Sequence, residues 1–240
     1  MANVSLGLED KVILVTGGNK GIGAAIVELL ESLGAKVAYT YRNGLGSEKS
    51  LGIQADVTDY DAMSAAAAQI EKELGPIYGL VANAGITRDG FFVKSSREQW
   101  DDVISTNLTG VYNTVRPVMP LLTERGLGSM VLISSVVGEK GNLGQANYAA
   151  AKGGVITLGK TLALEGARFN VRCNTIAPGF IRTAMVEAIP DNVQEKIVAT
   201  IPMRRFGEAS EIAWAATYLL SPVSSYVTGT VLSINGGQYM

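Results

Sequence analysis

The fold is decided by Lys11–Leu33, which reads KVILVTGGNKGIGAAIVELLESL. Its first part, Lys11–Thr16, is apolar on successive residues from Val12 to Val15, which is typical of a strand buried on both faces of a parallel sheet. A glycine-rich turn follows, and Gly21–Leu33 then has the apolar spacing of a helix. The segment therefore predicts a strand, a tight turn and a helix in direct succession.

The glycine-rich turn has the composition of a phosphate-binding loop. Glycines permit a tight turn and a close backbone approach to a pyrophosphate, and the amino end of the next helix presents free N–H groups. No Gly-Lys-Ser/Thr sequence ends the turn, which excludes a nucleoside triphosphate P-loop. We therefore predict dinucleotide binding, with contacts from Thr16, Gly17, Asn19, Lys20, Gly21, Ile22 and Gly23.

The alternation of strand and helix continues along the chain. Further buried strands are predicted at Ala35–Thr40, Leu51–Ala55, Ile77–Ala82, Met130–Ser134, Val171–Ile176 and Thr230–Ile234. Helical spacing is present in Asp59–Leu74, Arg97–Thr123, Asn147–Phe169 and Ala209–Leu220. This rhythm predicts an α/β protein with a single-domain Rossmann fold over residues 1–240, a doubly wound parallel seven-stranded sheet with helices on both faces.

Two segments depart from this rhythm. Tyr41–Ser50 is too short and too rich in Gly and Ser for a helix, so one crossover is predicted to be a loop. Residues 180–206 form a long insertion in which Pro190 and Pro202 interrupt a short helical stretch. Ligands of open α/β sheets bind beyond the carboxyl ends of the strands, so we expect a substrate lid here. The alternative is that the insertion only packs against the domain and has no role in binding.

Composition excludes several classes of protein. The 240 residues include no His and one Cys, which excludes His-dependent nucleophilic triads and His- or Cys-cluster metal sites. A net charge of -2 argues against nucleic acid or an anionic membrane as the main partner. The first residues resemble no secretory signal, and we expect the cytoplasm or another reducing soluble compartment. Cys173 is predicted to be a small buried apolar residue.

The choice of dinucleotide depends on charge after the second strand. An Asp or Glu there binds the ribose 2′-OH of NAD, whereas a 2′-phosphate needs a cation. Arg42 occupies this point, and Lys20 adds a second cation inside the glycine-rich turn. We therefore predict NADPH/NADP+ as the cofactor, the alternative being that both residues are solvated surface charges.

A tyrosine and a lysine four residues apart mark the candidate chemistry. Tyr148 and Lys152 share one face of a predicted helix, and Ser134-Ser135 ends the fifth strand. A neighbouring cation stabilises a phenolate, so we expect Lys152 to lower the pKa of Tyr148 below its usual value of about 10. Tyr148 would then serve as the proton donor and acceptor in a chain without histidine.

Over essentially its whole length the chain resembles the short-chain dehydrogenase/reductase family. The matching strings are TGGNKGIG, Asn83-Ala84-Gly85, Asn107, Ser135, the Tyr148/Lys152 pair and Pro178-Gly179. The resemblance implies that Tyr148 donates a proton to a carbonyl oxygen, Ser135 polarises that oxygen, Lys152 binds the nicotinamide ribose, and Asn107 holds a water of a proton relay. It also implies cofactor contacts at Asp56, Val57, Asn83, Ala84, Gly85, Tyr148, Lys152, Pro178, Gly179, Ile181 and Thr183.

Within that family the chain is most similar to 3-oxoacyl-[acyl-carrier-protein] reductases of fatty acid synthesis. The supporting strings are Ala84–Gly90, Gly141–Asn147 and Ile201–Gly207, and the short Tyr41–Ser50 loop resembles mycobacterial-type members. Acetoacetyl-CoA reductases share much of this pattern, and sugar or steroid reductases stay open as alternatives. A dinucleotide sensor without turnover would be expected to lack one of Ser135, Tyr148 and Lys152, all of which are present.

The resemblance also implies partners. An acyl-carrier protein or CoA thioester is the expected substrate, and an acidic carrier needs a basic landing site. Arg125 and Arg168 are expected to lie close to where family members dock the carrier, with Arg205 a weaker candidate and surface charges the alternative. Family members bury their two long helices and carboxyl-terminal segment in a tetramer, so we expect a homotetramer, with a dimer second.

Overall fold

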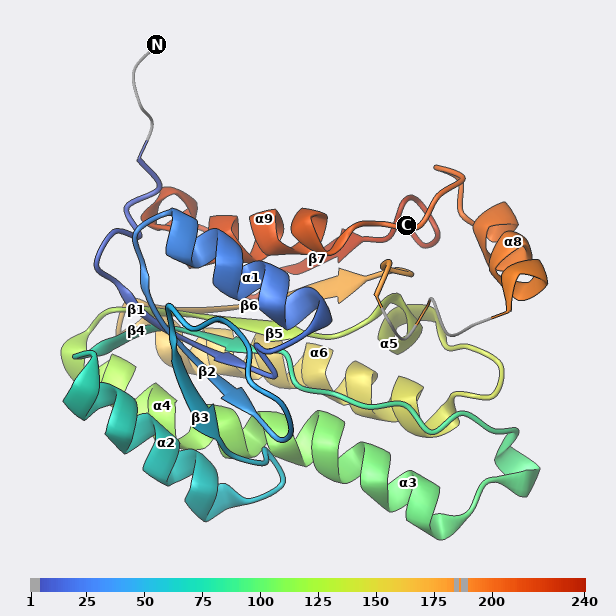
Figure 1. Ribbon diagram of the computed structural model, residues 1–240, viewed down its shortest axis with the longest axis horizontal. Coiled ribbons are helices and arrows are strands. Elements are labelled where there is room, and N and C mark those ends of the chain that lie inside the picture. The colour runs from blue at the N-terminus through green and yellow to red at the C-terminus, as the bar shows by residue number, and fades with distance from the viewer. Residues whose placement is uncertain (1–4, 184–185, 187–189) are drawn as a thin grey trace.

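The computed structural model describes residues 5–183, 186 and 190–240. Its centre is one seven-stranded sheet in the order β3-β2-β1-β4-β5-β6-β7, and every pairing is parallel (Figure 1). This confirms the predicted doubly wound α/β sheet. The strands are β1 Val12–Thr16, β2 Lys36–Tyr41, β3 Leu51–Gln54, β4 Ile77–Ala82, β5 Gly128–Ile133, β6 Val171–Pro178 and β7 Val231–Ile234.

Helices cover both faces of the sheet. Helices α1 and α9 lie on one face, and α2, α4 and α6 lie on the other (Figure 1). No helix separates β2 from β3, as the short loop predicted. The helices are α1 Gly21–Ser32, α2 Tyr60–Glu73, α3 Arg97–Ile104, α4 Gly110–Arg125, α5 Val136–Lys140, α6 Ala146–Ala167, α8 Asp191–Thr200 and α9 Ala209–Leu220, with short turns Phe92–Lys94, Ser105–Thr109 and Pro222–Ser224.

Successive side chains of the central strands point to opposite faces of the sheet and pack into two separate apolar cores. On β1, Ile13 and Val15 pack with α1 and α9, whereas Leu14 packs with α2, α4 and α6. All five residues of β1 are buried, which explains why its sequence is apolar without alternation. Cys173 on β6 is also fully buried, as predicted, and burial raises the pKa of its thiol to about 12.

The predicted helix Arg97–Thr123 is interrupted. Helix α3 ends at Ile104, and the π-helical turn Ser105–Thr109 connects it to α4. A π-helical turn inserts an extra residue per turn and is frequent at functional sites. The apolar periodicity of the sequence does not reveal this turn. Within it, the side chain of Asn107 is buried in the interior.

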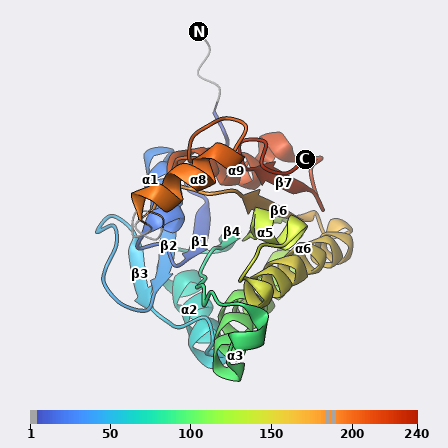
Figure 2. The same ribbon diagram turned by 90° about the vertical axis from the view of Figure 1, so that its right-hand side faces the viewer.

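The described parts of the predicted lid, residues 180–183, 186 and 190–206, lie beside the carboxyl ends of the strands, and residues 184, 185 and 187–189 of that prediction lie outside the described residues. Figure 2 shows α8 near the carboxyl terminus, with the amino-terminal part of α6 across from it. None of the residues of α8 is buried, while Val186, Ile201 and Phe206 form a small apolar cluster of their own. No helix in the described part of the chain is long and apolar enough to span a membrane.

Candidate active site

The glycine-rich turn forms a cradle that only small residues permit. Gly17 has a φ of +64°, and a Cβ on Gly23 would lie 2.2 Å from the carbonyl oxygen of Gly17. Lys20 is the N-cap of α1 but its side chain does not cap the helix, and the first turn of α1 contains no acidic residue. The free N–H groups and the positive end of the helix dipole therefore fit the pyrophosphate of a dinucleotide.

The cradle opens at the point where the strand order reverses, between β1 and β4. The backbone N–H of Asn83 donates to Thr16 Oγ1 at 3.0 Å, and Asn83 Nδ2 donates to the Thr16 carbonyl at 3.0 Å. Ala84 N–H also donates to Thr16 Oγ1, at 3.2 Å. These bonds join the ends of two non-consecutive strands at the crevice where open α/β sheets bind ligands.

Asn107 lies behind this crevice and is fully buried. Its Oδ1 accepts from Ile86 N–H at 2.8 Å, and its Nδ2 donates to the Ile86 carbonyl at 2.7 Å. A Cβ on Gly85 would lie 2.9 Å from Asn107 Oδ1 and 3.6 Å from Lys152 Nζ. The structure thus brings Asn107, Gly85 and Lys152 together, as the motifs predicted.

Two hydrogen bonds attach the catalytic helix to the end of β5. Lys152 Nζ donates to the Ile133 carbonyl at 2.8 Å, and Ser134 Oγ donates to the Lys152 carbonyl at 2.7 Å. Ser135 follows as the N-cap of α5, where its Oγ accepts from Val137 N–H at 3.1 Å. The structural use of Ser134 was not anticipated from the sequence, which pointed only to a hydroxyl at this strand end.

The electrostatics of the tyrosine–lysine pair differ from the prediction. Lys152 Nζ lies 5.7 Å from the ring centroid of Tyr148, so the two side chains are neighbours. Burial nevertheless raises the pKa of Tyr148 to about 12, with a hydrogen bond to Ser135 lowering it and the charge of Asp89 raising it. The expectation that Lys152 depresses this pKa is therefore wrong. The reason is that burial also lowers the pKa of Lys152 to about 8, which weakens it as a cation.

The two predicted 2′-phosphate cations are carried on neighbouring loops. Asn19 Nδ2 donates to the carbonyls of Asn43 and Gly44, at 2.9 and 3.2 Å, and so ties the glycine-rich turn to the loop after β2. Arg42 is 64% exposed, with only a 4.0 Å ion pair to Asp56. Lys20 is exposed and makes no ion pair within the described ranges. Both cations are therefore available to an anion.

Asp56 and Val57 lie at the end of β3, on the same side of the crevice. Asp56 Oδ1 accepts from Thr58 N–H at 2.9 Å and from Thr58 Oγ1 at 2.8 Å. Val57 is buried, and its carbonyl accepts from Asn113 Nδ2 at 2.9 Å. These contacts fix the turn that borders the predicted adenosine side of the site.

The segment after β6 closes the opposite side. Gly179 N–H donates to the Ile234 carbonyl at 2.9 Å, directly after Pro178. Ile181 pairs with Gly207, and Thr183 Cγ2 lies 3.5 Å from a Cβ built on Gly21 at the start of α1. The segment 178–183 therefore crosses from the sheet to the glycine-rich turn.

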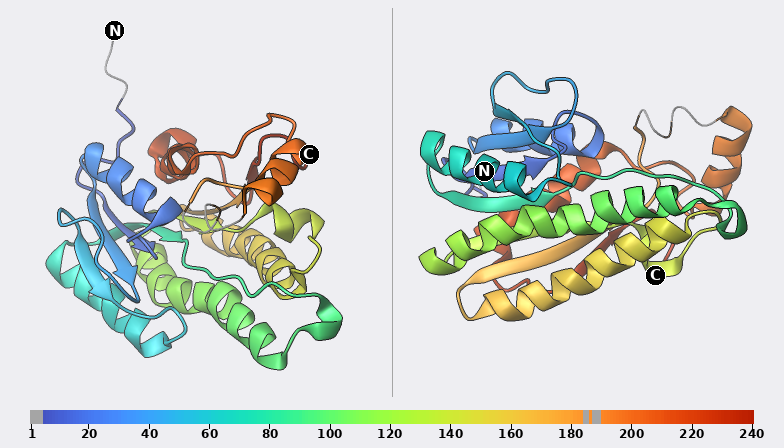
Figure 3. Two further views of the ribbon diagram at one scale, coloured as in Figure 1. Left: turned by 45° about the vertical axis from the view of Figure 1, so that its right-hand side comes forward. Right: turned by 90° about the horizontal axis from the view of Figure 1, so that it is seen from below.

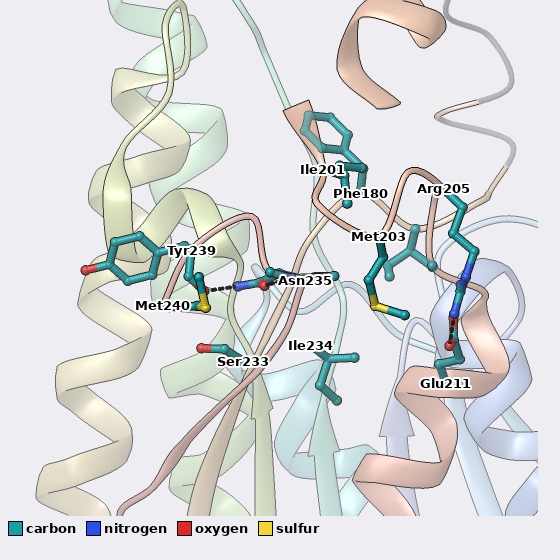
Figure 4. A pocket seen from close by; sticks show the side chains of 14 residues that line it. Phe180, Ile201, Met203, Arg205, Glu211, Ser233, Ile234, Asn235, Tyr239 and Met240 are labelled. Atoms are coloured by element: carbon teal, nitrogen blue, oxygen red, sulfur yellow. Dashed lines mark hydrogen bonds and ion pairs between the residues drawn. The ribbon is translucent and has the colours of Figure 1, made fainter. Parts of the chain in front are cut away.

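The base of the predicted lid rests on the carboxyl-terminal loop. Met203 N–H donates to the Gly236 carbonyl at 3.1 Å, and Arg205 forms two hydrogen bonds with Glu211, at 2.7 and 2.8 Å. Between them is a cavity of about 440 Å³, lined mainly by apolar side chains such as Phe180, Ile201 and Tyr239 (Figure 4). One of its polar side chains is bonded within the lining, with Asn235 Nδ2 donating to the Tyr239 carbonyl at 2.9 Å.

The two arginines predicted to dock a carrier lie elsewhere. Arg125 is the last residue of α4 and Arg168 follows α6, so both precede the amino ends of strands. Arg125 is hydrogen-bonded to Glu71 and to the Ile77 carbonyl, and the Arg168 guanidinium lies 4.6 Å from the Phe169 ring. Within one chain they are on the side of the sheet away from Ser135 and Tyr148, and docking there stays a prediction.

Together, the sheet and the crevice define an α/β fold of the type that binds dinucleotides. In the part of the chain that the structure describes, no group of His, Cys, Asp and Glu side chains could hold a metal ion. Residues 17–238 match a family model described as enoyl-(acyl carrier protein) reductase. The chain belongs to the short-chain dehydrogenase/reductase family, whose members use NAD(P)H, and it is an oxidoreductase acting on C=O/CH–OH groups.

Several curated relatives cover almost the whole chain. An acetoacetyl-CoA reductase of Synechocystis sp. is 57% identical over 238 residues, 98% of this chain and 99% of the relative. An acetoacetyl-CoA reductase of Rhizobium meliloti is 46% identical, covering 96% of this chain and 99% of the relative. A 3-oxoacyl-[acyl-carrier-protein] reductase of Vibrio harveyi is 42% identical, covering 98% of this chain and all of the relative (100%).

The buried lysine gives a pH dependence of stability. Since burial lowers the pKa of Lys152 from 10.5 to about 8, the unfolded chain binds more protons than the folded chain between these values. The free energy of unfolding of the wild type, minus that of Lys152→Met, should therefore increase by up to about 3 kcal/mol from pH 8 to pH 10.5. Urea unfolding of both proteins across this range measures it. A difference that stays flat would mean that the folded chain keeps Lys152 solvated.

Proposed function

We propose that this chain reduces a 3-oxoacyl thioester to the 3-hydroxyacyl thioester with NADPH. The observation that carries the proposal is the grouping of Ser135, Tyr148 and Lys152 at the carboxyl end of β5, beside a crevice suited to a dinucleotide. Acetoacetyl-CoA is the substrate we favour testing first, because two of the relatives described above carry that activity in their names. Carrier-linked substrates of fatty acid synthesis are the second candidate, from the relative in Vibrio harveyi.

The proposed roles follow from where each group lies. When bound, the reduced nicotinamide supplies the hydride that the carbonyl carbon receives. Tyr148 gives its proton to the carbonyl oxygen, since its phenol is protonated at neutral pH. Ser135 Oγ accepts from the backbone and its hydroxyl hydrogen-bonds to Tyr148, so this hydroxyl lies beside the proton donor, where it can turn to the developing negative charge. Lys152 and Asn107 hold the ribose and a relay water, behind Gly85.

Lys20 and Arg42 are proposed to bind the 2′-phosphate of NADPH. The Asn19 bonds bring their loops together, and neither side chain is committed to a close carboxylate. Residues 180–206 are proposed to act as the substrate lid, since α8 contributes nothing to the sheet cores. A reducing compartment such as the cytoplasm suits the free thiol of Cys173.

We propose that the chain assembles into a homotetramer through α4 and α6. These helices line an apolar groove of about 840 Å³, and Figure 3 shows them on the lower face of the molecule, beyond the sheet. Leu164 is 81% exposed and Tyr112 is 51% exposed along it. Exposed apolar side chains in such a groove are typical of an interface between subunits.

A substrate panel tests the reaction. NADPH oxidation is measured with acetoacetyl-CoA, with longer 3-oxoacyl thioesters on CoA and on a carrier protein, and with crotonyl-CoA. We expect turnover of the 3-oxoacyl thioesters and none of crotonyl-CoA, because Ser135 and Tyr148 are proposed to act on a ketone oxygen at C3, which crotonyl-CoA lacks. Tyr148→Phe should lower kcat by roughly a hundredfold or more and leave NADPH binding nearly unchanged. Reduction of crotonyl-CoA alone would replace the proposal with an enoyl reductase.

The cofactor preference has its own test. Arg42→Asp places a carboxylate where the 2′-phosphate is proposed to bind, so kcat/KM should shift from favouring NADPH to favouring NADH, by roughly a hundredfold in the ratio. Lys36→Asp, at an exposed cation on the amino side of β2, serves as the control and should keep the preference. A wild type that prefers NADH would contradict the proposal.

The assembly proposal predicts the effect of a single charge. Leu164→Glu buries an unpaired carboxylate in a tetramer, so it should shift the molar mass measured by light scattering to that of a smaller species. Leu143→Glu is a matched control, because Leu143 is 80% exposed but lies outside the groove. A wild type that is monomeric at micromolar concentration would refute the tetramer.

A further inference from the structure

Asn147 is a buried polar residue to which the motifs assign no role. It is the second residue of α6 and directly precedes Tyr148. Only 4% of its surface is exposed, although it lies at the end of a helix beside exposed loops. A buried amide of this kind costs free energy unless its donors and acceptor are all bonded.

Every hydrogen-bonding group of this amide is used, and each bond reaches a different segment. Asn147 Nδ2 donates to the Arg88 carbonyl at 3.1 Å, in the loop after β4, and to the Gln99 carbonyl at 3.0 Å, in the first turn of α3. Asn147 Oδ1 accepts from the backbone N–H of Tyr148 at 2.8 Å. One side chain therefore connects three segments around the proton donor.

The amino end of α6 depends on this amide because it lacks an ordinary cap. The N-cap residue, Gln145, makes no side-chain bond to the helix. Its Nε2 donates to both carboxylate oxygens of Asp89 at 3.0 Å, and its Oε1 accepts from Asn142 at 2.8 Å. The first N–H groups of a helix have no partner within it, and helix ends fray. Tyr148 lies in that first turn.

The segments that Asn147 reaches are themselves fastened. Arg88 forms an ion pair with Asp102 of α3 at 3.4 Å, and Gly90 N–H donates to the Gly144 carbonyl at 2.8 Å. Gln99 completes a capping box with Ser96 at the start of α3. Asn147 therefore joins α6 to a framework that is already held in place.

We propose that Asn147 is a positioning residue: by tying the first turn of α6 to the loop after β4 and to α3, it holds Tyr148 in place for proton transfer. The side chain has to be asparagine, because aspartate would set a carboxylate against two carbonyl oxygens and an apolar residue would remove the partners of the Arg88 carbonyl and the Tyr148 N–H. The inference rests on the proposed role of Tyr148 but not on which thioester is the substrate.

The first test separates rate from binding. Asn147→Ala and the milder Asn147→Ser, which keeps an acceptor for the Tyr148 N–H, should lower kcat by at least about tenfold, with Kd for NADPH within about threefold of the wild type. Rates are expressed per NADPH-binding molecule, so that loss of folded protein does not count. Asn142→Ala is the matched control, because Asn142 is an exposed asparagine of the preceding loop, and it should keep kcat within about twofold.

The second test needs no substrate. Tyr148 faces Lys152 and Asp89, and burial holds its pKa near 12. If the first turn loosens and admits water, the phenolate should appear at lower pH, toward the usual value of about 10. Its absorbance is isolated by subtracting the Tyr148→Phe counterpart of each protein.

The outcomes are distinct. A lower kcat together with an earlier phenolate titration in the Asn147 variants supports the positioning role. Variants that lose only thermal stability, with the wild-type rate per NADPH-binding molecule and an unchanged titration, overturn it. A wild type that reduces no 3-oxoacyl thioester refutes the proposed function, while the titration still decides the inference.

Discussion

The attachment of α6 to the end of β5 is the interaction on which the site depends. Lys152 Nζ bonds to the Ile133 carbonyl, and Ser134 Oγ bonds back to the Lys152 carbonyl. One strand end and one helix turn thus fix each other from both sides. Because Ser135 continues the strand and Tyr148 precedes Lys152 by one helical turn, the same two bonds bring both hydroxyl groups to one place. Neither bond involves a surface residue, so solvent does not compete with them.

Burial explains both the strength of this arrangement and its chemistry. A lysine enclosed without a carboxylate loses part of its charge, and a phenol enclosed beside it holds its proton more firmly. Tyr148 is therefore present as the protonated phenol rather than as a phenolate.

Much of this could be predicted from the sequence, because local rules govern it. Short runs rich in Val and Ile predicted all seven strands to within about two residues. The glycine spacing predicted the cradle, where Gly17 and Gly23 meet backbone requirements that other residues do not. The pKa of Tyr148 was mispredicted because helical spacing reports a neighbour but not how much water surrounds it. The π-helical turn at Asn107 escaped because apolar periodicity does not distinguish it from the α-helices on either side. Two of the three bonds of Asn147 escaped because their acceptors, the Arg88 and Gln99 carbonyls, are distant in the chain. Arg125 and Arg168 lie beside the amino ends of β5 and β6, because each follows a helix and precedes a strand. The docking prediction was taken from the family resemblance and did not use this order of elements.

The single thiol has a practical consequence. Cys173 lies inside β6, fully enclosed and with its pKa raised to about 12, so it presents almost no thiolate to electrophiles or peroxide. Cys173 of the folded chain should therefore react very slowly with thiol reagents under native conditions. Alkylation of Cys173 would report unfolding of the central sheet, which makes the residue a built-in probe of global opening for a protein whose proposed chemistry relies on a phenol.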